Sequence, residues 1–249
     1  MRSYSLVDIA PTIAGILGIC LTDADGRPIE EIMDCGCKNV ILIIVDSLDY
    51  GLYRWLKPDM KNMQAIESDG VLLSAEAVSN HTTPAIASIL SGLMPEHHGI
   101  YDKAGAKASS ILSLPEIASS SGLKSAVIME RSGAEVYEGL IEIIGGVSDS
   151  LSATEFDSEI LRLSLDAVRR RPRLLVTYFL GIDRTAHLGM GLGQIKDAAV
   201  FIDDCIGKLV RAVEQETVVI ICGDHTVHAG PLKRIHGPYC VALIAGTIA

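Results

Sequence analysis

The chain has 249 residues, of which 49% are hydrophobic, and its mean hydropathy is positive at +0.35. A chain of this length and composition buries a large core, which favours a globular domain and excludes a disordered or fibrous protein. The formal net charge of −10 is spread along the sequence without an acidic tail, which argues against nucleic-acid binding through phosphate neutralisation.

The first predicted element is a helix that begins near Asp8 and ends at Gly18. An Asp cap, Pro11 in the first turn and a terminal Gly all favour this interpretation. The basic start and apolar stretch imitate a secretory signal, but Asp8 and Pro11 interrupt the stretch and no A-x-A site follows it. No other run approaches a membrane-spanning length, so we expect no membrane partner.

Short apolar runs alternate with helical patterns along the rest of the chain, which is typical of an α/β fold. The apolar runs predict strands at 40–46, 71–77, 124–129, 174–180, 217–222 and 240–245. Helical spacing predicts helices at 59–68, 84–91, 113–121, 155–170 and about 193–214. We therefore expect residues 1–249 to form a single domain with a mostly parallel central sheet and helices on both faces.

The cysteines, at positions 20, 35, 37, 205, 222 and 240, form no C-x-x-C pair and no regular framework. This usage fits reduced thiols in a cytoplasmic protein. Cys35 and Cys37 offer a C-x-C metal clip, but such a pair on its own is more often a loop with two free thiols. We place no metal there.

Polar residues stand at the ends of the predicted strands. Because the carboxyl ends of parallel strands open on one crevice, such residues are candidates for a single site. They are, in chain order, Asp46, Asp183, His187, Asp224, His225 and His236, the last just ahead of the final strand.

Three carboxylates and three imidazoles form a mixed ligand set, which suits zinc, manganese or iron better than calcium or magnesium. Each residue alone has an ordinary alternative, since an Asp at a strand end often caps a helix and a single His often bonds the backbone. Their recurrence at successive strand ends favours a shared site for two divalent metal ions, with zinc as the first choice and manganese or iron as the alternatives.

Thr82 and Thr83 stand where a loop turns into the helix predicted at 84–91. A helix N-terminus offers free N–H groups and a positive dipole end, so it binds an anionic phosphoryl group readily. The Thr82 hydroxyl can there ligate a metal and attack phosphorus, while the N–H of Thr83 points at a substrate oxygen. The alternative is that Thr82 only caps the helix.

These segments resemble the alkaline phosphatase superfamily, nearest its nucleotide pyrophosphatase/phosphodiesterase and sulfatase-like branch. The resemblance rests on VILIIVDSLDYG at 40–51, TTPAIASILSGLMPEHHG at 82–99, GIDRTAHLGMG at 181–191, GDH at 223–225 and HG at 236–237. It implies that Thr82 is the catalytic nucleophile. It also implies two ligand sets, which are Asp46, Thr82, Asp224 and His225 for one metal, and Asp183, His187 and His236 for the other.

Departures from the family's pattern narrow these implications. Sulfatases need a Cys or Ser at the nucleophile position, so Thr82 argues against sulfatase activity. Phosphodiesterases of this type often carry an Asn after the H-G, whereas HGIYDKAG at 98–105 leaves Lys103 as the nearest candidate for contacting a substrate oxygen. The chain is also shorter than most members, which leaves little room for a specificity cap.

The order of the segments also departs from the family. The segment at 5–29 is similar to one that follows the last metal His and its strand in many relatives. The resemblance therefore implies a circular permutation, in which residues 1–33 are equivalent to the C-terminal segment of relatives. Because a permuted chain needs neighbouring termini, we expect this segment to pack beside the C-terminal strand.

The resemblance and the ligand pattern together predict a two-metal hydrolase of small-molecule phosphate esters, a phosphodiesterase/nucleotide pyrophosphatase or a phosphatase, that acts through a phospho-threonine. One alternative is a phosphomutase of the same superfamily, which needs a cap that retains the intermediate. Another is a catalytically inactive metal-binding module, against which the complete ligand set argues. Among the remaining histidines, His228 is expected to line the pocket and ranks below the seven ligand candidates. His81, His97 and His98 are expected to flank helices or to support the metal ligands from behind.

Overall fold

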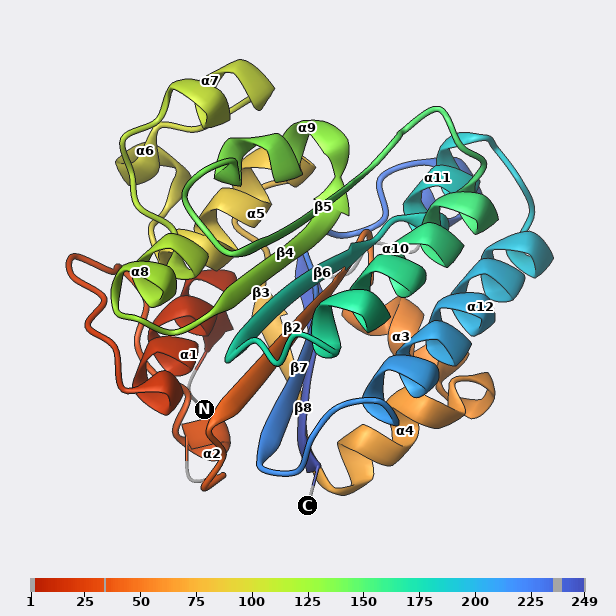
Figure 1. Ribbon diagram of the computed structural model, residues 1–249. Coiled ribbons are helices and arrows are strands. Elements are labelled where there is room, and N and C mark those ends of the chain that lie inside the picture. Colours follow the sequence, from red (N-terminus) through yellow and green to blue (C-terminus); the bar gives the residue numbers. More distant parts are fainter. Residues whose placement is uncertain (1–2, 34, 235–238, 249) are drawn as a thin grey trace.

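The computed structural model describes residues 3–33, 35–234 and 239–248 (Figure 1). In these residues a single eight-stranded sheet lies between layers of helices. The strands are β1 (Tyr4–Ser5), β2 (Asn39–Val45), β3 (Gly70–Glu76), β4 (Ser125–Glu130), β5 (Ile143–Val147), β6 (Leu174–Phe179), β7 (Thr217–Gly223) and β8 (Cys240–Ile248).

Long helices alternate with short ones between the strands. The α-helices of the described residues are α1 (Ile9–Leu17), α2 (Glu30–Met33), α3 (Tyr50–Leu56), α4 (Lys61–Ser68), α5 (Thr82–Ser91), α6 (Pro95–His98), α7 (Lys103–Ala108), α8 (Leu114–Ser120), α9 (Arg131–Ala134), α10 (Ala153–Val168), α11 (Gly181–His187) and α12 (Leu192–Val210). Short 3₁₀ turns lie at Leu6–Asp8, Lys57–Asp59, Glu135–Tyr137 and Gly230–Arg234.

The sheet has the order β1-β3-β8-β7-β2-β6-β4-β5. All of its pairings are parallel except the two made by β8, which runs antiparallel to β3 and β7. The fold class expected from the sequence is therefore confirmed. Because β8 is reversed, its first residue lies at the edge where the parallel strands have their carboxyl ends, with Cys240 paired to Glu76.

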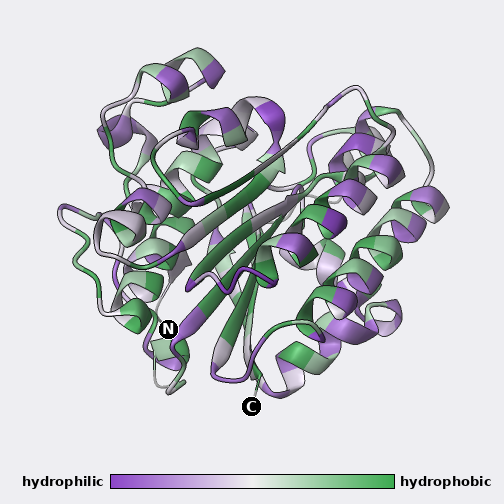
Figure 2. Ribbon diagram, in the orientation of Figure 1, coloured by the Kyte–Doolittle hydropathy of each residue, from purple (hydrophilic) through white to green (hydrophobic). Residues whose placement is uncertain are grey.

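Helices cover both faces of the sheet. In Figure 1, α1 and α8 lie on one side, and α4, α10 and α12 lie on the other. Strands β6 and β7 are buried at every residue, and β2 at every residue after Asn39, which explains why they read as unbroken apolar runs. Figure 2 shows the same central strands in green, with the purple, hydrophilic residues on the outer helices.

The N-terminal segment contains the expected helix, α1. This helix follows the short strand β1, which pairs with β3. Helix α1 ends at Gly18, which has a φ of 67°, a conformation that glycine adopts without strain. Asp8 occupies the N-cap position of α1, but its side chain makes no capping hydrogen bond to the helix. Its carboxylate accepts hydrogen bonds from the N–H groups of Ser5 (3.0 Å) and Arg27 (2.7 Å), so it ties the strand, the helix and the following loop together.

The expectation that residues 1–33 pack beside the C-terminal strand is wrong in this structure. Strand β1 pairs with β3, and β3 separates it from β8. Tyr4 lies beside Ala75, and Ala75 lies beside Val241, near the start of β8. The far end of β8, at Ile248, is therefore about 23 Å further along the strand at about 3.3 Å per residue. The circular permutation itself stays a prediction.

The sequence patterns located most long elements, with small errors at their ends. Helix α5 begins two residues earlier than expected, at Thr82, and α12 ends at Val210 rather than near 214. Strands β1 and β5 were not predicted, and neither were the short helices α2, α3, α6, α7, α9 and α11. No helix in the described ranges combines the length and the apolar composition that crossing a bilayer requires.

Candidate active site

The acidic residues predicted for the site meet at the carboxyl edge of three neighbouring strands. Asp46 follows β2, Asp183 lies in α11 just after β6, and Asp224 follows β7. Because β2 lies between β7 and β6 in the sheet, the parallel order brings these side chains together, as the sequence predicted. Gly223 permits the close fit, since a Cβ at this position would lie 2.4 Å from the carbonyl oxygen of Leu48.

The first expected ligand group converges around one imidazole nitrogen. The Nε2 atom of His225 lies 3.2 Å from Asp46 Oδ1 and 3.5 Å from Asp224 Oδ2. The Thr82 hydroxyl lies 3.2 Å from the same nitrogen. The structure therefore brings together all four residues that the family resemblance assigned to one metal, although they come from α5 and from the segments that follow β2 and β7.

Two carboxylate oxygens of this group are buried without a hydrogen bond from any described residue, namely Asp46 Oδ1 and Asp224 Oδ2. Their partner oxygens are satisfied: the Tyr178 hydroxyl donates to Asp46 Oδ2, and Asp224 Oδ1 accepts from the N–H groups of Ser47 (3.1 Å) and His225 (2.9 Å). A buried carboxylate oxygen without a donor costs several kcal/mol, on the order of 2–5. Such a pair of oxygens, facing the same imidazole, fits a cation.

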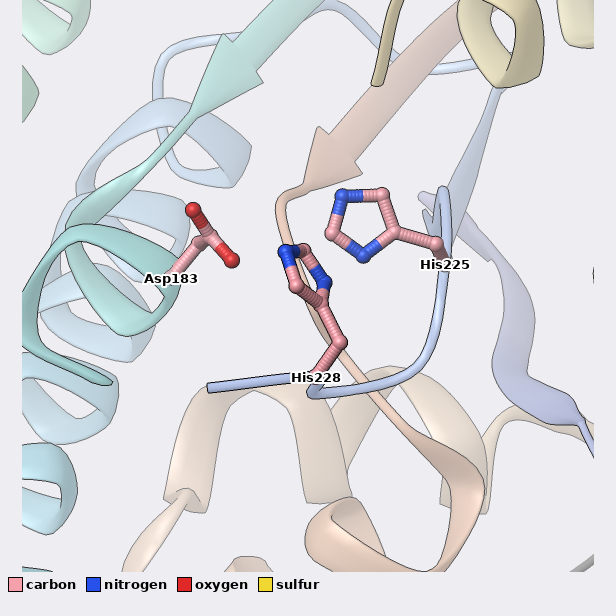
Figure 3. A group of neighbouring side chains, drawn as sticks. All are labelled: Asp183, His225 and His228. Carbon is pink, nitrogen blue, oxygen red and sulfur yellow. The ribbon is translucent and has the colours of Figure 1, made fainter. Parts of the chain in front are cut away.

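The second group contains one residue that the sequence ranked lower. His187 Nε2 lies 3.5 Å from Asp183 Oδ2 and 3.0 Å from His228 Nε2. The His228 Nδ1 atom is buried and has no hydrogen bond from the described residues. Figure 3 shows that His228 points between Asp183 and His225, and one ligand atom from each of these three residues lies within 4.8 Å of the others.

Asp183, His187 and His228 therefore form the second candidate ligand group in the described part of the chain. The predicted ligand His236 lies outside the described residues. His228 follows β7 by five residues and had no strand-end position to signal its role.

Ser47 connects the two groups and was missed by sequence reasoning. Its hydroxyl donates to Asp183 Oδ1 (2.7 Å) and lies 3.3 Å from His225 Nδ1. Its φ of 63° is left-handed, a conformation that costs a non-glycine residue energy and occurs often at functional sites. Nothing in the segment VDSLD would have revealed this backbone strain.

Burial and mutual repulsion shift the pKa values of these groups. Burial, together with the nearby charge of Asp224, raises the pKa of Asp46 to about 8. Burial also raises the pKa of Asp224. Burial alone would lower the pKa of His225, but the charges of Asp224 and Asp46 outweigh it and raise that pKa to about 10. Buried carboxylates at this separation repel one another. A bound cation would relieve this repulsion.

Thr82 is not the cap of its helix. The cap residue of α5 is His81, and Thr82 occupies the first helical position. The Thr82 hydroxyl therefore remains available to the metal-ligand group, which it meets at His225. The first N–H groups of a helix have no acceptor within the helix, so the start of α5 presents donors beside this hydroxyl.

The other two histidines of the segment support the local structure. His98 Nδ1 accepts from the N–H of Ile100 (2.9 Å), and its Nε2 lies 3.0 Å from the Ser88 hydroxyl. His97 pairs with Asp25 at 2.8 Å. Neither His97 nor His98 contacts the metal-ligand groups through a described hydrogen bond, which agrees with the expected helix-flanking role.

A cavity of about 610 Å³ opens from the site. Asp46, Thr82, Asp183 and His187 line one end of it, and Thr83 and Lys103 also contribute to its wall. The Lys103 ammonium lies 3.3 Å from the Glu130 carboxylate, so a substrate oxygen would compete with that ion pair. The role of Lys103 in substrate binding stays a prediction.

Two family models match overlapping segments that together cover most of the chain. The sulfatase family model matches residues 38–160. The model of type I phosphodiesterase/nucleotide pyrophosphatase matches residues 122–238. A comparison with curated proteins found no match.

Solved structures of the same fold are numerous but distant in sequence. Phosphonoacetate hydrolase from Sinorhizobium meliloti 1021 superposes with a TM-score of 0.62 at 14% identity, over 84% of this chain and 60% of its own length. Murine ectonucleotide pyrophosphatase/phosphodiesterase 5 gives 0.59 at 18% identity, over 76% of this chain and 57% of its own. A putative sulfatase from Bacteroides thetaiotaomicron gives 0.63 at 12% identity, over 88% and 65%.

This chain therefore spans about 60% of the length of the phosphonoacetate hydrolase that it matches. The segment matched by the sulfatase model contains Asp46 and Thr82, and the segment matched by the phosphodiesterase model contains Asp183 and Asp224. The chain belongs to the alkaline phosphatase superfamily, in the branch of the nucleotide pyrophosphatases/phosphodiesterases and sulfatases.

Proposed function

We propose that the protein hydrolyses phosphate esters with the help of two divalent metal ions and with Thr82 as the nucleophile. The observation that carries the proposal is the meeting of the Thr82 hydroxyl with His225, next to two buried carboxylate oxygens that lack a donor. A hydroxyl at a helix N-terminus, beside a cation-binding group, is placed to attack an anionic phosphoryl centre.

The donor set decides which metals suit the site. Asp46, Thr82, Asp224 and His225 would hold one ion, and Asp183 and His187 the other, with His228 as an additional ligand and His236 as predicted from the family pattern. Mixed oxygen and imidazole ligands favour zinc, with manganese or iron as alternatives. When bound, such ions supply Lewis-acid polarisation of the phosphoryl oxygens and lower the pKa of a hydroxyl or water.

The residues of the chain divide the remaining tasks. The N-terminus of α5 binds the phosphoryl oxygens, and the Thr82 Oγ1 loses its proton and forms a bond to phosphorus while the bond to the leaving alcohol oxygen breaks. The alcohol takes up a proton as it departs. A water then gives up a proton and attacks the same phosphorus, the Oγ1–P bond breaks as Oγ1 takes up a proton, and phosphate leaves. Ser47 holds Asp183, and Tyr178 holds Asp46, through their hydroxyl donors.

Substitutions at the two threonines test this function. Metal-stripped protein is supplied with zinc or manganese and assayed with p-nitrophenyl phosphate, bis-p-nitrophenyl phosphate and p-nitrophenyl sulfate. Thr82→Ser keeps a hydroxyl and is expected to retain substantial phosphate-ester turnover, whereas Thr82→Ala should lose several orders of magnitude, on the scale of a lost nucleophile. Thr83→Ala keeps its backbone N–H and serves as the matched control.

The result also separates the alternatives. Turnover of the sulfate ester alone would contradict the phosphatase assignment, and full activity of Thr82→Ala would contradict the covalent step. Transfer of the phosphoryl group to an added alcohol without net hydrolysis would favour a phosphomutase. Metal binding without turnover of any ester would favour the inactive metal-binding module.

A further inference from the structure

The cavity beside the metal-ligand groups continues well beyond the space that a phosphoryl group needs. Its volume of about 610 Å³ lies in the range of pockets that hold drug-sized ligands. One end is polar, with Asp46, Thr82 and Asp183. The other end is lined by the segment that leads from α6 to α8. The polarity of the side chains at this end determines which organic group could accompany the phosphate.

Helix α5 directs an apolar stripe into this cavity. Thr83, Ile86, Ala87 and Leu90 line it, at the i, i+3, i+4 and i+7 spacing of one helical face. The stripe begins next to the nucleophile and runs away from it along the helix. A substrate held at Thr82 would therefore extend its organic group along an aliphatic surface.

Other elements add further apolar side chains to the wall, among polar ones. They come from the segments on both sides of α7, from the end of β4 and from the β4–β5 connection, and they are Ile100, Ile111, Met129, Val136 and Leu140. Leu140 is 50% exposed, which places an apolar side chain at the rim where it faces solvent. An exposed leucine that lines a cavity is available to an apolar ligand.

The two lysines that line the cavity are already paired with carboxylates. Lys103 pairs with Glu130 (3.3 Å) and Lys107 pairs with Glu135 (2.9 Å). A polyphosphate would need these ammonium groups to leave their carboxylates. The pairing therefore disfavours a second anionic group at this end of the cavity.

The two tyrosines of the lining offer no stacking platform for a nucleobase. Tyr137 and Tyr178 are 6% and 5% exposed, and their hydroxyl groups are engaged with Ser113 and Asp46 respectively. The described wall thus lacks the exposed aromatic face on which bases stack. An aliphatic or aryl group without charge matches this wall better than a nucleoside.

We infer that the substrates are phosphate esters of apolar alcohols, whose alkyl or aryl group occupies the chamber between α5 and the segment of residues 100–111. This inference rests on the proposed function for the phosphoryl end of the site. The chamber itself is tested separately, because the binding of a neutral apolar molecule requires neither metal nor turnover.

The first arm measures N-phenyl-1-naphthylamine, a neutral fluorescent probe, on the full chain. We expect saturable binding that Ile111→Asp weakens at least tenfold, since Ile111 lines the chamber. Leu112→Asp is the matched control, because the neighbouring Leu112 is 60% exposed and outside the lining. Leu140→Asp, at the exposed rim, gives a second lining variant if Ile111→Asp does not fold, as judged by circular dichroism.

The second arm compares n-butylphosphonate with methylphosphonate as competitors of the probe on zinc-loaded protein. Each methylene that leaves water contributes about fourfold to affinity, so we expect the butyl compound to bind at least tenfold more tightly. Ile111→Asp should bring this ratio close to one, and Leu112→Asp should preserve it.

The two arms distinguish the failure of the chamber from the failure of the enzyme. Absent probe binding, probe binding that both lining variants retain, or equal affinities for the two phosphonates would overturn the inferred substrate class, even if p-nitrophenyl phosphate is hydrolysed. Probe binding that the lining variants lose, in a protein that hydrolyses no phosphate ester, would support the chamber and reject the proposed function.

Discussion

Replacing Asp224 with Asn isolates the electrostatic cost of the metal-free site. The substitution preserves the side-chain shape, and the Asn oxygen can still accept from the N–H groups of Ser47 and His225, which lie 3.1 and 2.9 Å from Asp224 Oδ1. The new amide nitrogen takes the place of Oδ2, which has no donor in the described structure and lies 3.5 Å from His225 Nε2. Only one buried negative charge is lost.

The metal-free Asp224→Asn variant should therefore be more stable than the metal-free wild type. Relief of one uncompensated buried charge contributes about 1–3 kcal/mol, which corresponds to roughly 2–12 °C in Tm for a chain of this size. Zinc at a hundred times its Kd stabilises the wild type by about 2.7 kcal/mol, and the variant should lose most of that increment. Differential scanning fluorimetry with and without zinc measures both effects.

The pH dependence of this stability difference is a second test of whether Asp224 destabilises the metal-free protein. Burial raises the pKa of Asp224 in the folded protein, so the folded state binds this proton more tightly than the unfolded chain does. The contribution of the group to stability is therefore greatest in acid and is lost as the pH rises above about 4, the ordinary value of an unfolded Asp. The advantage of the metal-free Asp224→Asn variant should accordingly grow between pH 5 and pH 8.

Asp203 offers a matched control. It is also buried, but its two oxygens accept hydrogen bonds from Met63 N (2.8 Å) and from the backbone and side-chain nitrogens of Asn62 (both 2.9 Å). Asp203→Asn should lower Tm and keep the full zinc increment. If Asp224→Asn is no more stable than wild type without metal, and zinc raises both by the same amount, the unpaired oxygens do not face a cation and the ligand assignment is wrong.

Two further predictions follow from contacts at and near the site. Tyr178→Phe removes the donor to Asp46 and should weaken zinc binding by about 10–100-fold in calorimetry, as expected for the loss of a group that orients a ligand. Hydrogen bonding to Asp25 raises the pKa of His97. Burial raises the pKa of Asp25, but hydrogen bonds from Met94 and His97 outweigh burial and lower that pKa. The pair should therefore stabilise the fold most between about pH 4 and 6.5. Asp25→Asn should therefore lower Tm more at pH 6 than at pH 8 and move the NMR titration of His97 down.

The central strands could be predicted from the sequence because burial on both faces requires apolar residues at every position. Strands β2, β6 and β7 are covered on both faces, so they need uninterrupted apolar runs. Strand β5 is different: its sequence is IIGGV, and two adjacent glycines contain no strand signal. Strand β1 has two residues and exists only because it pairs with β3, so no local pattern could have revealed it.

The site was predictable where topology alone determines it. Asp46, Asp183 and Asp224 follow parallel strands and had to meet once the strand order was β7, β2, β6. Ser47 and His228 reach the site through a left-handed backbone and through the loop after β7. These positions depend on dihedral angles that the residue types do not specify, so sequence reasoning missed Ser47 and placed His228 only as a residue of the pocket.

The charges of the described residues indicate why two cations rather than one suit the proposed reaction. Asp46, Asp183 and Asp224 bring three carboxylates to the site, and both lysines of the cavity wall, Lys103 and Lys107, are paired with glutamates. A phosphate dianion would meet net repulsion there, and like charges 4 Å apart at an effective dielectric constant of 20 repel by about 4 kcal/mol. One divalent ion would leave the three carboxylates in excess, whereas two divalent ions reverse the sign and attract the phosphoryl group. The net charge of the whole chain, −10, also favours metal binding before substrate binding, because it attracts cations and repels a phosphate ester. Metal binding must then precede substrate binding, and the apolar chamber, which is insensitive to this charge, can select the organic group only after the metals have made the phosphoryl end attractive.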